Sequence, residues 1–167
     1  MLRHRIKRAF RTLGVITTSC GIVGFAIPLG AAPAPTAPAA QDVNGSPGVV
    51  AEIVQCNRDS GVLSIRMRLR NTGGEDAKLL LISRNNYDNY YVVAGDKKYL
   101  VLRDKEGTPL ATQRNVSDGY GGAVEVTIPK GGSYVWYAKY PAPPVDVKKI
   151  DYYTPLTVPF ERIPITD

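Results

Sequence analysis

The feature that most constrains the fold is a two-residue alternation of apolar and polar side chains. Between residues 63 and 70, leucine, isoleucine and methionine alternate with serine and arginine. Similar alternation occurs at 124–128 and at 134–139. A period of two places successive side chains on opposite faces of a β-strand, whereas a helix needs a period of 3.6. No eleven-residue window has a convincing helical period, so the sequence predicts strands with one buried and one wet face.

Turn residues separate further short strands in the rest of the chain. The apolar run Leu79–Ile82 indicates a more central strand that is covered on both faces. About seven to nine strands with turn signals every 8–12 residues predict an all-β fold, an antiparallel immunoglobulin-like two-sheet sandwich. A sheet closed on itself is the alternative. Trp136 is the expected core aromatic. The remaining strands are expected at 78–84, 90–94, 98–103, near 110, at 148–153 and at 161–165.

The N-terminus has the pattern of an export signal. Five basic residues within the first eleven precede an apolar stretch from Leu13 to Leu29, and small residues and prolines follow. The stretch is interrupted by glycine and proline, and it is weaker than a typical membrane-spanning helix. We therefore expect a cleaved signal peptide, preceding the sandwich, and no stable membrane span after cleavage. A retained anchor would also export the domain.

Cleavage fits best after Ala31, because a cut one residue later would leave Pro33 just past the bond. Residues 32–47 are rich in alanine and proline and are predicted to be a flexible linker. The predicted organisation is a signal peptide at 1–31, a linker at 32–47 and a β-sandwich domain at 48–167. The protein is expected to be exported, to the periplasm or the extracellular space.

Removing the predicted signal peptide lowers the formal net charge of the chain. The formal net charge of +6 comes from 21 basic and 15 acidic residues, and five of the bases precede the apolar stretch. The remaining 16 bases against 15 acids leave about +1. Nucleic acid is therefore not an expected partner.

Histidine and cysteine are almost absent from the predicted mature chain. The only histidine, His4, lies in the signal, so histidine-based triads and metal sites are excluded from the domain. Cys56 is the single cysteine that remains, in an apolar-patterned run, and is expected to be buried and inert. No cofactor and no metal are predicted.

Four segments carry a resemblance to known domains, at 65–73, 99–107, 136–144 and 158–165. They resemble a group of uncharacterised secreted bacterial immunoglobulin-like domains. The resemblance implies the fold and the location and transfers no site residues.

The segment from Asn85 to Tyr91 is the leading binding candidate. Tyrosine offers broad amphipathic contact area and asparagine adaptable polar contacts, a mixture used by paratopes and sugar sites. The other interpretation is a polar turn with tyrosines packed at the domain edge. The candidate ligand-binding residues are Asn86, Tyr87, Asn89, Tyr90 and Tyr91.

Arg66, Arg68 and Arg70 form a basic stripe on one strand face. The stripe suits an anionic polymer such as an envelope glycan, and the other interpretation is an exposed face matched by cross-strand carboxylates. Four aspartates at 88, 96, 104 and 118 lie in turns and are explained by turn chemistry.

The sequence thus predicts an exported, non-catalytic interaction domain whose partner is an unknown protein or envelope glycan. The alternative is a small carbohydrate-binding module that uses the tyrosine- and asparagine-rich loop. A third reading is a carboxylate-based hydrolase, which needs two carboxylates facing each other across a cleft.

Overall fold

The computed structural model describes residues 40–113 and 122–167, which lie within one compact unit. The predicted signal peptide, its cleavage site at Ala31 and the first part of the linker lie outside the described residues. Over the described ranges the fold is all-β, with antiparallel strands and one short 3₁₀ turn, η1 (Tyr87–Asn89).

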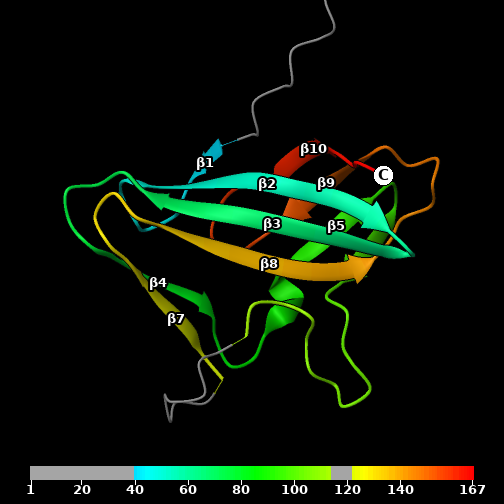
Figure 1. Cartoon of the computed structure of the whole chain (residues 1–167), viewed down its shortest axis with the longest axis horizontal. Coiled ribbons are helices and arrows are strands. Elements are labelled where there is room, and N and C mark those ends of the chain that lie inside the picture. Colours follow the sequence, from blue (N-terminus) through cyan, green and yellow to red (C-terminus); the bar gives the residue numbers. More distant parts are fainter. Residues whose placement is uncertain (1–39, 114–121) are drawn as a thin grey trace, which may run out of the picture. The chain divides into compact units, whose positions relative to one another are not determined.

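Three sheets make up the described fold (Figure 1). The front sheet has the order β1 (Ala40–Asp42), β2 (Val49–Asp59), β3 (Val62–Asn71), β8 (Ser133–Pro141). The back sheet has the order β10 (Phe160–Pro164), β9 (Lys149–Tyr153), β5 (Tyr91–Ala94), β6 (Lys97–Leu100). The small sheet pairs β4 (Ala77–Ile82) with β7 (Val124–Ile128).

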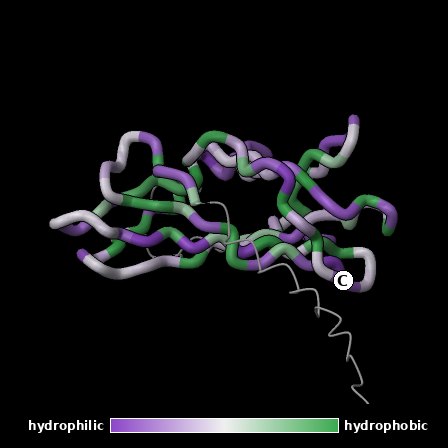
Figure 2. The backbone as a smooth tube through the Cα atoms, turned by 90° about the horizontal axis from the view of Figure 1, so that it is seen from above, coloured by the Kyte–Doolittle hydropathy of each residue, from purple (hydrophilic) through white to green (hydrophobic). Residues whose placement is uncertain are grey.

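The alternation in β3 gives the strand one buried face and one exposed face, as predicted. Leu63, Ile65, Met67 and Leu69 are fully buried, and the arginines between them are exposed. β3 lies between β2 and β8 and is paired along its whole length with both. Figure 2 colours the backbone by hydropathy, and hydrophilic and hydrophobic stretches are interspersed along it.

Backbone hydrogen bonds join the front and back sheets at both edges. Just past β6, the amide of Leu102 donates to the Lys139 carbonyl of β8 at 2.8 Å. Just past β10, Thr166 accepts from the Arg58 amide at 2.8 Å and donates to the Cys56 carbonyl at 3.0 Å. These contacts satisfy backbone groups that an open edge would leave unpaired.

Arg58 reinforces the second of these edges. Its side chain is buried, and its guanidinium donates to the carbonyls of Pro143 and Pro144 at 3.1 and 2.6 Å. The same group pairs with the Asp167 carboxylate at 2.7 Å. One buried arginine therefore holds the proline-rich connection before β9 against the segment that follows β10.

The run Leu79–Ile82 differs from the prediction. Among the described strands β4 pairs only with β7, and Leu80 is 50% exposed while Leu79, Leu81 and Ile82 are buried. The prediction of a central strand covered on both faces was therefore wrong. The apolar run marks a strand with one buried face and an irregular register after Leu80.

The ordered fold extends N-terminal to residue 48. β1 pairs with the first half of β2, and Val43 is buried in the core. Gly48 closes the turn between them with a φ of +81°, and a Cβ built on it would lie 2.8 Å from the Gly73 Cα. Residues 40–47 thus contribute a strand and a close turn, although their composition is typical of a linker.

Trp136 lies at the centre of the core, as predicted, with no exposed surface. Aromatic rings lie against it within the core cluster. The ring of Tyr90 stacks on it with centroids 4.3 Å apart, and its Nε1 donates to the Tyr152 hydroxyl at 3.1 Å. Tyrosine fills this core because each buried hydroxyl has a hydrogen-bond partner.

Candidate functional site

The tyrosine- and asparagine-rich loop is divided between core and surface. Tyr87 and Tyr90 are 3% and 0% exposed, and both rings stack against Trp136. The Tyr90 hydroxyl donates to the Leu81 carbonyl at 2.7 Å, and that of Tyr87 to the Thr112 carbonyl at 3.2 Å. These two rings therefore have no free face for a ligand.

Asn86 and Asn89 are exposed beside the buried tyrosines. Between them Asp88 forms an exposed ion pair with Arg103 at 3.5 Å. The structure does not bring the predicted amides and rings together on one surface. The burial of Tyr87 and Tyr90 follows the interpretation of the loop as a polar turn.

Tyr91 lies on the outer face of the back sheet, and its ring contacts two other side chains, Tyr153 and Lys98. Tyr153 on β9 stacks against it at 4.7 Å with an interplanar angle of 7°. Lys98 on β6 places its Nζ 3.7 Å from the Tyr91 centroid. Because β9 and β6 flank β5 on opposite sides, both faces of the Tyr91 ring are covered. A sugar that stacks on aromatic faces would have to displace one of these partners.

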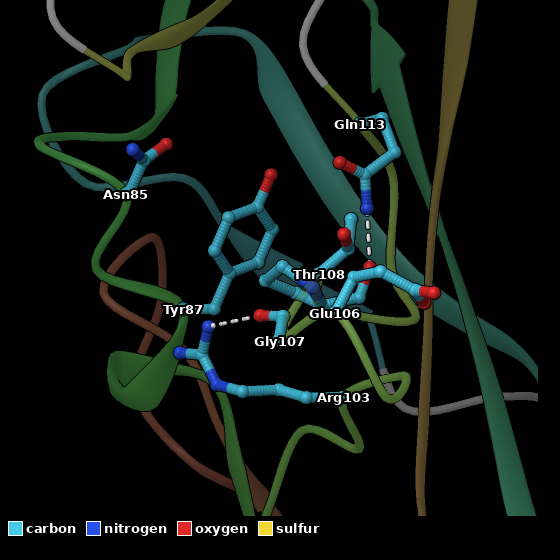
Figure 3. Close-up of a pocket in the computed structure, with 8 residues that line it drawn as sticks. Asn85, Tyr87, Arg103, Glu106, Gly107, Thr108 and Gln113 are labelled. Carbon is cyan, nitrogen blue, oxygen red and sulfur yellow. Dashed lines mark hydrogen bonds between the residues drawn. The ribbon is translucent and has the colours of Figure 1, made fainter.

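A shallow polar pocket of about 310 Å³ lies next to Tyr87 (Figure 3). Arg103 donates to the Gly107 carbonyl at 3.1 Å, and the Gln113 amide donates to the Pro109 carbonyl. Of its described lining residues, Glu106 is the only carboxylate. The lining is completed by Asn85, Tyr87, Arg103, Gly107, Thr108, Pro109 and Gln113.

This pocket does not present the acid pair that a carboxylate-based hydrolase requires. The nearby Asp104 uses its Oδ1 to accept from the amides of Glu106 and Thr108 at 3.0 and 2.7 Å. Its carboxylate is therefore engaged in turn chemistry, as predicted. Over residues 40–113 and 122–167, no group of three or more histidine, cysteine or acidic side chains is placed to hold a metal.

The outer face of the front sheet carries the basic stripe. Arg66, Arg68 and Arg70 are exposed on β3, and only Arg70 has a carboxylate partner, Glu52, at 3.0 Å. Within the part of the chain that the structure describes, Arg66 and Arg68 make no ion pair. The expected matching of the stripe by cross-strand carboxylates is thus limited to one of three arginines.

Exposed apolar and aromatic side chains flank the stripe. Tyr137 lies opposite Arg66 and is 42% exposed, and Val135 lies opposite Arg68 and is 47% exposed. On the other side Val54, at the bulge of β2, is 37% exposed. We refer to Arg66, Arg68, Arg70, Val54, Val135 and Tyr137 as the front-face patch.

The alternation at 134–139 puts Val135 and Tyr137 on the strand face opposite Trp136, but it does not show that this face adjoins the arginines. The missing information was the strand order, since β3 and β8 are separated by more than sixty residues. Alternation fixes which face a residue occupies but not which strand lies beside it.

Cys56 is buried, as predicted, and desolvation raises the pKa of its thiol to about 12.

Among the described residues, no helix has the length and apolar character needed to cross a membrane.

Comparison with known proteins adds no relative: no family model matches the chain, and neither a curated protein nor a solved structure is significantly similar. The resemblance to secreted immunoglobulin-like domains therefore stays a prediction.

Proposed function

We propose that the protein is an exported, non-catalytic binding domain of the cell envelope, with an immunoglobulin-like sandwich. Its binding surface is the front-face patch, and its partner is a negatively charged envelope component. One observation carries the proposal: Arg66 and Arg68 lie exposed, with no ion pair to any described residue, next to exposed Tyr137 and Val135.

The composition of the patch supports binding. Arginine and tyrosine are enriched where proteins make their energetically important contacts, because both offer large area together with hydrogen-bonding groups. The exposed face of a sheet suits an extended partner better than a small molecule, which needs a concave site. The envelope location rests on the N-terminal basic and apolar pattern, which also explains the high basic count.

The alternative functions have less support from the geometry. A sugar site built on the Asn86–Tyr91 loop would need ring faces that Tyr87, Tyr90 and Tyr91 use for internal packing. A hydrolase would need two carboxylates that face each other across a cleft. Glu106 is the only carboxylate among the described lining residues of its pocket. A second pocket contains Glu75 and Asp76, but these are chain neighbours, and Asp76 accepts from the Lys130 amide at 3.0 Å.

Site-specific photocrosslinking in the native host tests the proposal. A photoreactive phenylalanine analogue at Tyr137 is expected to give a discrete adduct in the envelope fraction. The same analogue at Tyr91, a half-buried tyrosine on the back sheet, is the matched control and should give none. Equal adducts from both positions, or none from Tyr137, would refute the proposed surface.

A further inference from the structure

The front-face patch is part of a longer line of positive charge along β3. Arg66, Arg68 and Arg70 point to the same face, and Lys139 of β8 continues the line opposite Ser64. Alternate residues on a strand lie about 6.6–6.8 Å apart, so the line runs for roughly 20 Å. Arg66, Arg68 and Arg70 are evenly spaced along β3, which lies between β2 and β8.

Three carboxylates share this face: Asp42 and Glu52 lie near Arg70, and the exposed Asp59 lies at the other end, opposite Val62. Glu52 binds Arg70, and Asp42 on the edge strand β1 lies opposite Val50, which pairs with Arg70. Glu52 also lies opposite Arg68 in the register, so Arg66 and Lys139 are the cations of this face whose strand partners include no carboxylate among the described residues.

Neutral hydrogen-bonding side chains of β2 lie beside the line of cations. Gln55 pairs in register with Arg66, and Asn57 pairs with Ser64. The amide of Gln55 donates to Asn57, which orients both groups. Amides and hydroxyls of this kind bind sugar hydroxyls, while the planar arginine fork binds carboxylate or phosphate with two parallel bonds.

We propose that a linear anionic polysaccharide, with a carboxylate or phosphate on its repeating unit, lies along β3. Arg66 and Arg68 bind its acidic groups, and Tyr137 contacts its sugar rings. This inference rests on the proposed function and names the partner of the same surface. A polymer fits the patch because its identical charges recur along a line, as the arginines do.

The experiment measures binding of the exported protein, purified from its host, to polygalacturonate, neutral dextran and polyglutamate. The double variant R66Q/R68Q is compared with K97Q/K105Q, which removes the same formal charge at exposed positions outside the front-face patch. Urea-unfolding midpoints of both variants should match the wild type, which excludes misfolding as the cause of lost binding.

We expect wild type to bind polygalacturonate but not dextran, with affinity that falls as salt is raised. R66Q/R68Q should lose about tenfold or more in affinity, the equivalent of one good charged contact. K97Q/K105Q should change it by less than about twofold. The conservative variant R66K/R68K should restore part of the loss, since charge returns without the planar fork.

Three outcomes overturn the inference. If polyglutamate binds as tightly as polygalacturonate, the surface recognises acidic charge on any chain. If K97Q/K105Q weakens binding as much as R66Q/R68Q, the attraction is not located at the patch. If no polyanion binds while Tyr137 still crosslinks in cells, the proposed function stands and its partner is not an anionic polysaccharide.

Discussion

At the scale of single residues, the tyrosines of the predicted binding loop are structural. Tyr87→Ala removes a buried ring that stacks 6.2 Å from Trp136. It should lower the free energy of unfolding by about 3–5 kcal/mol, as should Trp136→Ala, because both leave a cavity in the core. Urea titration measures the loss. Tyr91→Ala, at a half-exposed position, should cost clearly less. A Tyr87→Ala protein as stable as wild type would return this residue to the list of binding candidates.

Cys56 should be inert in the native protein. Burial raises the pKa of its thiol to about 12, so almost no thiolate exists at pH 8. A thiol reagent should react slowly with the folded protein and rapidly in urea. The neutral thiol is favoured only in the folded state, so its contribution to stability is complete below the ordinary cysteine pKa and is lost as pH rises above it. Equal reaction rates with and without urea would contradict the burial.

At the scale of elements, the turn before β2 depends on the absence of a side chain at Gly48. Gly48→Ala requires a left-handed backbone and also brings a Cβ within 2.8 Å of the Gly73 Cα. Gly45→Ala is the matched control, since its φ is +70° and nothing lies within 4 Å of the added carbon. Strain alone should cost about 1–2 kcal/mol at Gly45. The loss at Gly48 should be larger, and equal unfolding midpoints would argue against the close approach.

The sequence predicted some elements better than others for physical reasons. The strands with strict alternation, such as β3 and β8, were placed correctly because solvent wets only one of their faces. β1 was missed because it has only three residues and lies within an alanine- and proline-rich stretch. The front-face patch combines residues from β2, β3 and β8, and pairing between distant strands leaves no signal in one sequence.

At the scale of the whole molecule, the tyrosine-rich core makes stability sensitive to alkali. Burial raises the pKa of five of the ten tyrosines, namely Tyr87, Tyr90, Tyr134, Tyr140 and Tyr152. Their contribution is complete below the unfolded pKa of about 10 and is lost as pH rises above it, because only the unfolded chain then ionises.

Tyrosinate absorbance and circular dichroism should follow this loss together. These five tyrosines should ionise only when the β-sheet signal disappears. If they ionised while the dichroism stayed unchanged, their rings could not lie in the core.

The pairing of Thr166 with β2 has a consequence for the order of folding. The contact with Cys56 joins residues 110 positions apart, so the front sheet is completed only after most of the domain has been synthesised. Folds dominated by such non-local pairs have high contact order and form slowly. A chain that folds late remains unfolded for longer. Such a delay would suit passage through a translocation channel, before Thr166 pairs with β2.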